Sequence, residues 1–173
     1  MDVMFDKCLA EIAEALSYVP WIDTVYGRGE RVAKEIGGRR VYLPAIWTAD
    51  NEYHLLTPDS GEGNFAWIWV DDPQTVSRLG GTVTATISII VWYDFQLVTG
   101  GDRQRDTLKA EVLNLLQSEG LRSGIFTATR IWELAENIYK DFSLEETENQ
   151  FLMHPYGGFR IEGVLETSLP CIE

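Results

Sequence analysis

The 173-residue chain has few cysteines, few basic residues and no long apolar run. Its two cysteines, Cys8 and Cys171, are too few for the disulfide framework of a small secreted domain, so we expect two free thiols in a reducing compartment. The longest strongly apolar stretch, residues 87–92, is far shorter than the roughly 20 residues of a membrane helix. Residues 1–16 carry charges throughout, which is not the pattern of a signal peptide. We therefore expect a soluble protein without a membrane partner.

Basic residues are scarce relative to acidic ones. The chain has 14 Lys and Arg against 27 Asp and Glu, which gives a formal net charge of −13. A nucleic-acid surface needs cations that neutralise phosphates. This balance therefore predicts no specific nucleic-acid binding.

Motifs of catalysis and of cofactor binding are also missing. The glycines of residues 26–31 are not followed by the strand, third glycine and helix of a dinucleotide loop, and residues 100–107 lack the Gly-Lys-Ser/Thr of a phosphate loop. No Gly-x-Ser-x-Gly nucleophile elbow occurs. His54 and His154 lie outside any usual zinc-ligand spacing. We expect no cofactor, no metal and no enzymatic activity.

Adjacent carboxylates are the remaining candidates for acid–base chemistry. They occur at Asp71 and Asp72, and again at Glu145, Glu146 and Glu148. Such pairs act as acid and base where a cleft separates their pKa values. With 27 acidic residues, neighbouring carboxylates are also expected on a solvated surface, so we assign no catalytic residue.

Two segments have the apolar spacing of amphipathic helices. The first covers residues 3–17, with Asp2 as the expected N-cap. The second follows the expected N-cap Asp102 and ends at Gly120, a residue suited to the position after a helix. A capping box of Ser143 and Glu146 predicts a further short helix over residues 144–150.

The remaining segments alternate between strands and loops. Residues 27–40 are rich in glycine and predicted to be a loop, and residues 48–63 form a long polar loop. Pro44 cannot donate a ladder hydrogen bond, so we place it at an edge or a bend. The predicted strands are residues 21–26, 39–47, 64–70, 82–97, 125–134 and 159–168.

The clearest strand signal is the alternation of residues 82–97. At about 3.3 Å per residue this strand would reach about 50 Å, whereas a compact domain of this length is about 40 Å across. The strand must therefore bend or overhang.

The order of elements favours an α+β fold. Strands run consecutively, which indicates an antiparallel or mixed β-sheet with the two main amphipathic helices packed on one face and residues 82–97 as the long central strand. No repeat or shift in composition divides the chain, so we expect residues 1–173 to form a single domain. A sheet covered on one side leaves its other face in need of a partner.

Aromatic residues indicate where that partner could bind. Most of the six tryptophans fall in predicted strands and are expected in the core. Trp67, Trp69 and Trp92, together with Ile90, lie where both strand faces are apolar. A subunit interface is the alternative to the core for these residues.

Three segments resemble a known class of proteins. Residues 141–166, 65–73 (FAWIWVDDP) and 83–95 (VTATISIIVWYDF) resemble small prophage-encoded virion proteins of the tail-terminator and head-tail joining class of tailed phages. The resemblance implies α+β subunits whose sheets join in a closed ring, commonly a hexamer, that caps the tail tube. It implies no catalytic residues.

The resemblance also implies partners and a location. The chain would self-associate and bind other phage tail or neck proteins, assembling in the host cytoplasm before it enters the virion. The overlong strand would supply an arm, and an acidic lumen would let DNA pass without gripping it. The predicted interface residues are Trp67, Trp69, Ile90, Trp92, Tyr156 and Phe159.

Two other functions stay open. One is a small-molecule-binding or hydrolytic domain with a pocket near Trp67, Trp69 and Asp71, which a cleft containing His54 or His154 beside a carboxylate would favour. The other is an accessory or immunity-type protein that binds one partner.

Overall fold

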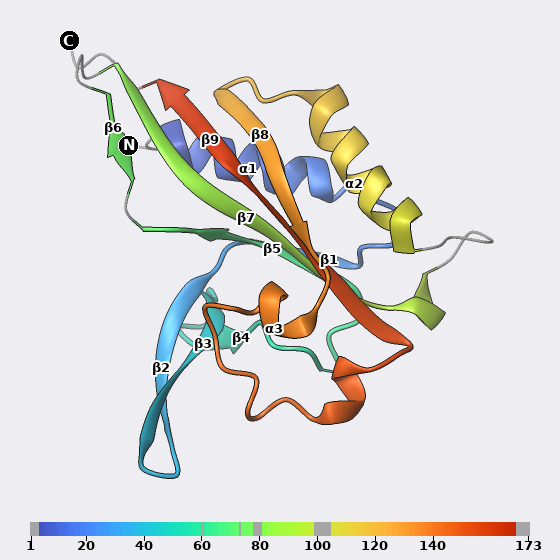
Figure 1. The fold of residues 1–173 in the computed structure, drawn as a ribbon. Helices are drawn as coiled ribbons and strands as arrows, with labels where there is room; N and C mark the ends of the chain where they lie inside the picture. The colour runs from blue at the N-terminus through green and yellow to red at the C-terminus, as the bar shows by residue number, and fades with distance from the viewer. Residues whose placement is uncertain (1–3, 60, 73, 78–80, 99–104, 169–173) are drawn as a thin grey trace.

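The chain folds into a large mixed β-sheet with two long helices on one side and a smaller sheet attached at one edge (Figure 1). The structure is a computed structural model that describes residues 4–59, 61–72, 74–77, 81–98 and 105–168. The α+β class predicted from the sequence is confirmed.

The large sheet has the strand order β1-β5-β7-β9-β8, with the short strand β6 beside β7. β1 runs parallel to β5, and the other neighbours are antiparallel, so the sheet is mixed. The strands are β1 (Thr24–Arg28), β5 (Phe65–Val70), β6 (Thr75–Val76), β7 (Thr82–Asp94), β8 (Gly124–Trp132) and β9 (Tyr156–Ser168).

The long strand β7 is paired along its whole length. Each of its 13 residues pairs with β9, from Thr82 opposite Ser168 to Asp94 opposite Tyr156. The strand ends at Asp94, whose side chain accepts a hydrogen bond from the Gln96 amide at 2.9 Å and so starts the 3-10 helix η1 (Phe95–Leu97). The predicted arm is therefore wrong, because β9 is equally long and covers β7 from end to end.

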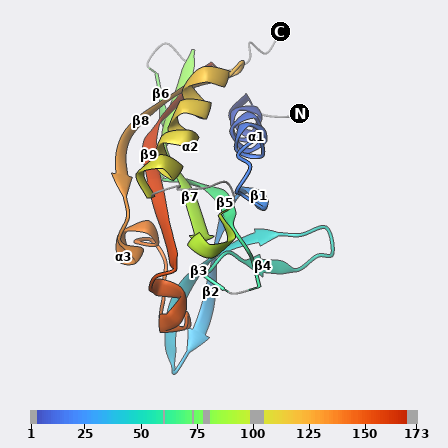
Figure 2. The same ribbon diagram turned by 90° about the vertical axis from the view of Figure 1, so that its right-hand side faces the viewer.

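Two helices lie on the first side of this sheet (Figure 2). They are α1 (Met4–Leu16) and α2 (Arg105–Glu119), and their buried residues, among them Ile12 and Leu108, belong to one core cluster with residues of β5, β7 and β9. Gly120 follows α2 with a φ of +61°, as expected for a residue that ends a helix. The predicted N-caps Asp2 and Asp102 lie outside the described residues.

The small sheet occupies much of the region predicted as loops. It has the order β2-β3-β4, with β2 (Glu30–Ile36), β3 (Arg39–Trp47) and β4 (Tyr53–Leu55). β2 and β3 form a hairpin around Gly37 and Gly38, both with positive φ, which is the backbone of a two-residue hairpin turn. The predicted loop over residues 27–40 is wrong because glycine here makes a turn between strands. Pro44 lies inside β3, where the pairing with β4 ends and its carbonyl accepts the Leu56 amide at 2.9 Å.

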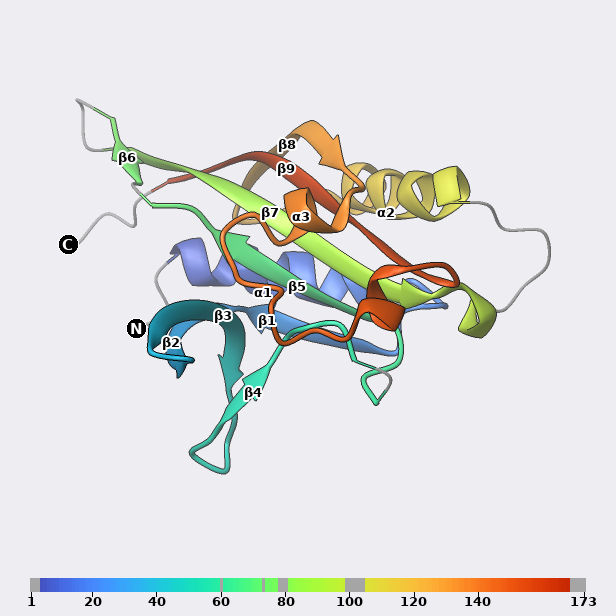
Figure 3. The same cartoon turned by 60° about the horizontal axis from the view of Figure 1, so that its bottom comes forward.

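The second face of the large sheet is crossed by residues 133–155 (Figure 3). This segment contains α3 (Ala135–Ile138) and the 3-10 helix η2 (Asn149–Leu152). The predicted helix over residues 144–150 is wrong: the Ser143 hydroxyl accepts the Glu145 amide in a local turn. The predicted strand over residues 159–168 begins earlier, at Tyr156, so the following glycines are strand residues.

None of the helices in the described parts of the chain is both long and apolar enough to cross a membrane.

Candidate functional site

The second face of the large sheet has an apolar half and a polar half. In the apolar half, Trp67 and Ile90 are fully buried and Trp92 is 3% exposed, packed under Tyr139 and Phe142. The chain's own segment therefore covers the surface for which the sequence predicts a second copy.

This packing corrects the predicted interface. Trp67, Ile90 and Trp92 are unavailable to a partner, and Phe159 is buried on the other face of the sheet against Trp21. Trp69 and Tyr156 are half-buried. The expectation failed because residues 133–155, taken as connecting chain, supply a layer of their own.

The polar half begins at Arg160 on β9, whose side chain is 0% exposed. Its Nε donates to the Ser88 hydroxyl at 2.9 Å. Its Nη1 donates to the Ile138 carbonyl at 3.2 Å and to the Asp141 carboxylate at 2.8 Å. A buried guanidinium is tolerated only with such partners. Arg160 thereby joins α3 to the centre of the sheet.

Further charges surround this guanidinium. Glu162, two residues along β9, accepts a hydrogen bond from Lys140 at 2.7 Å. Asp71, just after β5, lies 3.8 Å from Arg160 Nη2. Two cations and three carboxylates thus form one network, which we call the Arg160 network: Arg160, Lys140, Asp71, Asp141 and Glu162.

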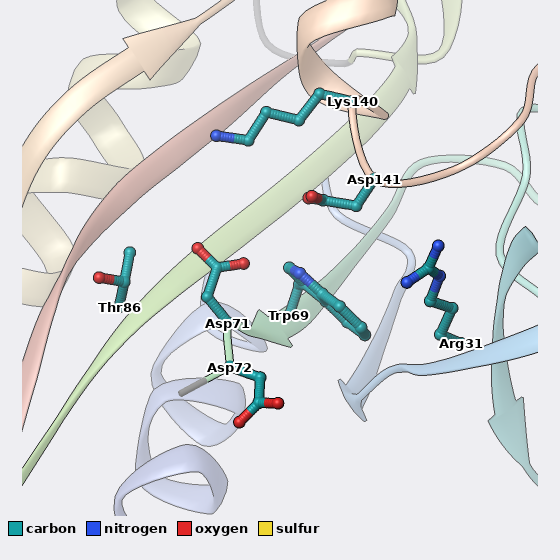
Figure 4. A pocket seen from close by; sticks show the side chains of 7 residues that line it. All are labelled: Arg31, Trp69, Asp71, Asp72, Thr86, Lys140 and Asp141. Carbon is teal, nitrogen blue, oxygen red and sulfur yellow. The ribbon is translucent and has the colours of Figure 1, made fainter. Parts of the chain in front are cut away.

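A pocket of about 640 Å³ opens beside the Arg160 network (Figure 4). Side chains from three strands and from the end of α3 converge on it. Its lining residues are Arg31, Trp69, Asp71, Asp72, Thr86, Lys140 and Asp141. The Asp71–Asp72 pair therefore borders a cavity, as acid–base chemistry would require. The carboxylate that acts on the pKa of Asp71 is Asp141 and not Asp72.

Burial and neighbouring charges shift the pKa values of two of these carboxylates, Asp71 and Glu162, in opposite directions. Burial raises the pKa of Asp71; Arg160 opposes the shift and the charge of Asp141 reinforces it. Burial also acts to raise the pKa of Glu162, but the hydrogen bond and charge of Lys140, helped by Arg160, hold that pKa below its ordinary value. Glu162 therefore stays ionised to lower pH than an ordinary glutamate.

Two buried N–H donors next to Asp71 have no hydrogen-bond acceptor. They are Arg160 Nη2 and Trp69 Nε1. The indole of Trp69 is close enough to favour the ionised form of Asp71, although it makes no hydrogen bond of normal geometry. Unpaired buried donors cost free energy. Both atoms are enclosed by the protein, and Arg160 lies outside the set of residues that line the pocket.

The sequence-based analysis found part of this pocket. Trp69 and Asp71 line it as predicted, whereas Trp67 is buried behind it. Arg160 and Lys140 were missed. The available signal was the charge of Arg160 and Glu162 at alternating positions of a predicted strand, where both face the same side of the sheet as Ser88.

The two histidines lie elsewhere. His54 Nε2 is 2.9 Å from the Glu62 carboxylate, which also accepts the Tyr26 hydroxyl at 2.7 Å. His154 lines a separate hollow of about 470 Å³ that also contains Glu133 and Glu136. None of the described residues lining the Trp69–Asp71 pocket is a histidine or a cysteine.

Strand β8 is an exposed edge of the large sheet. It pairs with β9 on one side, and no described strand pairs with the other side. Six of its nine residues are exposed, including Ile125 at 66% and Ile131 at 41%. Its only charged residue is Arg130. Soluble proteins usually protect such an edge with charge, proline or cover, so β8 is a candidate contact surface.

The β2–β3 hairpin is a second candidate surface. It carries four of the chain's basic residues within residues 30–40, against two glutamates. Lys34 pairs with Glu146 at 2.7 Å and Arg39 with Glu145 at 3.0 Å, which places those two predicted carboxylates in exposed ion pairs. The hairpin is therefore a basic projection from an acidic chain.

The chain offers no metal-ligand cluster among its described residues. Cys8 is a buried free thiol, and burial raises its pKa, whereas Cys171 lies outside the described residues. Comparison with protein-family models, with curated proteins and with solved structures found no match.

Proposed function

We propose that the chain is a non-enzymatic assembly protein of a tailed phage, of the tail-terminator or neck class, that works by self-association into a closed ring. The observation that carries the proposal is the exposed, nearly uncharged edge strand β8. The sequence resemblance in residues 65–73, 83–95 and 141–166 supplies the phage context.

The edge of β8 favours association for two reasons. Its outer backbone N–H and C=O groups have no strand partner among the described residues, so a second strand can extend the sheet there. Burial of Ile125 and Ile131 would add about 1–2 kcal/mol each. The contact would involve β8 and not the tryptophans of the covered face.

The net charge of −13 is consistent with this role. A ring at the end of a tail tube has to let DNA pass through its lumen without holding it. Acidic subunits repel the phosphate backbone and so avoid strong binding.

Light scattering tests the proposal directly. We expect the purified chain to form a closed oligomer, and we expect the double variant Ile125→Lys and Ile131→Lys to raise the dissociation constant by roughly tenfold or more. Leu97→Lys is the matched control, because Leu97 is 51% exposed but lies outside β8. A wild-type chain that stays monomeric at high concentration would refute self-association.

Electron microscopy tests the phage context. Virions produced without this chain should show tails that lack a normal end or are not joined to heads. Normal virions in its absence would contradict the proposed class even if the purified chain forms rings.

A small-molecule-binding role is the second candidate. It is favoured by the pocket at Trp69 and Asp71, which is lined by both acidic and basic side chains. For the hydrolytic version, the described residues that line this pocket include no histidine or cysteine, whereas the separate hollow at His154 brings a histidine together with Glu133 and Glu136 and so favours that version there.

A melting assay tests this second role. The pocket is lined by three carboxylates, Asp71, Asp72 and Asp141, so we expect a small ammonium compound or amide that binds beside them and Trp69 to raise the melting temperature, and Trp69→Phe to reduce the shift. Trp47→Phe, at an exposed tryptophan of β3, is the control. No shift across ammonium compounds and amides would count against a ligand.

A further inference from the structure

The outer edge of β2 is the counterpart of β8 in the small sheet. β2 pairs only with β3, and no described strand covers its other side. Five of its seven residues are exposed. At the tip, neither Gly37 nor Gly38 has another residue within 4 Å of where a Cβ atom would lie. The hairpin therefore projects from the body and offers a second free strand edge.

The two edges lie at opposite ends of the molecule. β8 closes the large sheet on one side, and β1 closes it on the other. The small sheet is attached next to β1, where the Gly29 amide donates to the Ile68 carbonyl at 2.8 Å. Figures 1, 2 and 3 agree in placing β2 far from β8. Two different surfaces allow head-to-tail contacts between copies, and such contacts form a ring when the rotation from one copy to the next closes.

Charge on the two surfaces is complementary. Arg31 and Arg40 stack with Tyr42, and neither has a carboxylate partner in the described parts of the chain. Near β8, the exposed Glu166 lies opposite Ile125 in the sheet, and the exposed Glu136 follows the strand in α3. Neither glutamate has an ion pair with another described residue. Each surface thus carries charges that the other can neutralise.

We infer that the outer edge of β2 in one copy pairs with the outer edge of β8 in the next, so that the β2–β3 hairpin is the docking element of the ring. The inference rests on the proposed self-association and names the partner of β8. Pairing seven residues of β2 with nine of β8 continues the large sheet of one copy into the small sheet of its neighbour.

The alternative is a two-fold contact between two β8 strands. It would place the same face of both copies together and bring two Arg130 side chains close to the centre of one interface. It would also leave both β2 edges unpaired and would stop at a dimer.

A crosslinking experiment separates these arrangements. Ala33 and Ala128 are exposed residues near the middle of β2 and β8, so strands paired in either direction bring them close. In a background with Cys171→Ser, chains carrying Ala33→Cys are mixed with chains carrying Ala128→Cys and treated with a short bismaleimide. We expect covalent two-chain species in the mixture and none in either variant alone.

Each outcome has a distinct meaning when light scattering is recorded on the same samples. Crosslinked Ala128→Cys alone supports the two-fold β8 contact and overturns the inference. An oligomer without crosslinks in the mixture overturns the docking of β2 but leaves self-association intact. Monomers throughout overturn the proposed function itself.

Specificity is checked with a control pair. Ala49→Cys is exposed and lies between β3 and β4, away from the outer edge of β2. Mixed with Ala128→Cys, it should give no two-chain species. Equal crosslinking by Ala49→Cys and Ala33→Cys would show random collision and would overturn the inference.

Discussion

Arg160 is the residue on which the second face of the sheet depends. Its guanidinium is completely buried, and it connects β7, β9, α3 and the Asp141 carboxylate. Removing one member of a buried ion pair leaves its partners charged without compensation, which costs more than the loss of the contact itself.

Arg160→Met keeps the length of the side chain but removes its charge. We expect it to lower the free energy of unfolding by about 3–5 kcal/mol at pH 7, measured in urea. Arg39→Met, at a side chain that is 73% exposed, should cost at most about 1 kcal/mol. Equal losses in the two variants would contradict the role of Arg160.

The cost of Arg160→Met should also depend on pH. Burial already raises the pKa of Asp71, and Arg160 opposes that shift, so without the guanidinium the pKa of Asp71 in the folded state should rise further above its unfolded value. This part of the penalty is then present above the raised pKa and disappears as the pH falls below the unfolded pKa of about 4, where Asp71 is protonated in both states. Urea unfolding at pH 7 and pH 4 measures this difference.

Glu11 on α1 fixes the connection between α2 and β8. Its carboxylate accepts the Ser123 hydroxyl at 2.7 Å and the Arg122 amide at 2.8 Å. Burial acts to raise its pKa, but the hydrogen bonds from Ser123 and Arg122 outweigh burial and lower it. The Glu11 carboxylate therefore stabilises the fold at pH values above its pKa in the unfolded chain. This stabilisation is lost as the pH falls through its lower pKa in the folded chain.

Glu11→Gln should therefore destabilise the chain by about 1.5 kcal/mol at pH 7. The difference from wild type should shrink below about pH 4, where the wild-type carboxylate is protonated. Thermal melting across this range provides the measurement. Glu14→Gln, one turn away and exposed, is the control and should change little.

At the scale of elements, the pairing of β7 with β9 requires a glycine at position 158, opposite Trp92. A Cβ atom on Gly158 would lie 2.4 Å from the Trp92 ring and 2.5 Å from the Val91 carbonyl oxygen. The carbonyl belongs to the backbone of β7, so it cannot move aside without breaking the ladder.

Gly158→Ala should destabilise the chain by about 1–3 kcal/mol or more, because it overpacks a closed core. Gly27→Ala on β1 has nothing within 4 Å and should be nearly neutral. Thermal melting compares the two variants, and near-ultraviolet circular dichroism reports on Trp92. Similar melting temperatures would contradict the close approach of β7 and β9.

At the scale of the whole molecule, charge is unevenly distributed. The chain has a net charge of −13, while residues 30–40 have a net charge of +2. A basic projection on an acidic body attracts a second copy at long range, and salt screens that attraction.

Association should therefore weaken with salt. Between about 0.1 M and about 1 M salt the screening length falls from about 10 Å to about 3 Å. We expect the dissociation constant of the oligomer to rise several-fold over this range, measured by light scattering. The combined variant Arg31→Gln and Arg40→Gln should be weaker at low salt and respond less to added salt. Association that strengthens with salt in both chains would indicate a purely apolar contact.

Most single elements could be predicted from the sequence. The apolar spacing of residues 3–17, the apolar run of residues 64–70 and the alternation of residues 82–97 led to α1, β5 and β7, although β7 ends at Asp94. The predicted strand over residues 39–47 is confirmed as β3, but β2 was missed because its charged residues hide the alternation, although Gly37 and Gly38 are a turn signal.

The candidate site could be predicted only in part. The sequence drew attention to Trp69 and Asp71, which do line the pocket. It did not indicate Arg160, Lys140 and Asp141 as their neighbours, because these residues come together through the pairing of β9 with β7 and the packing of α3.

The sequence by itself determined the α+β class, the two long amphipathic helices and the acidic charge, because these depend on composition and on short-range periodicity. Only the tertiary structure decided what covers the second face of the sheet. Residues 133–155 have weak local preferences, and they cover Trp67, Ile90 and Trp92 through contacts distant in sequence. The surface that is exposed for contact is therefore the edge of β8 and not the tryptophans expected from the sequence. Only the strand order shows that β8 is an edge.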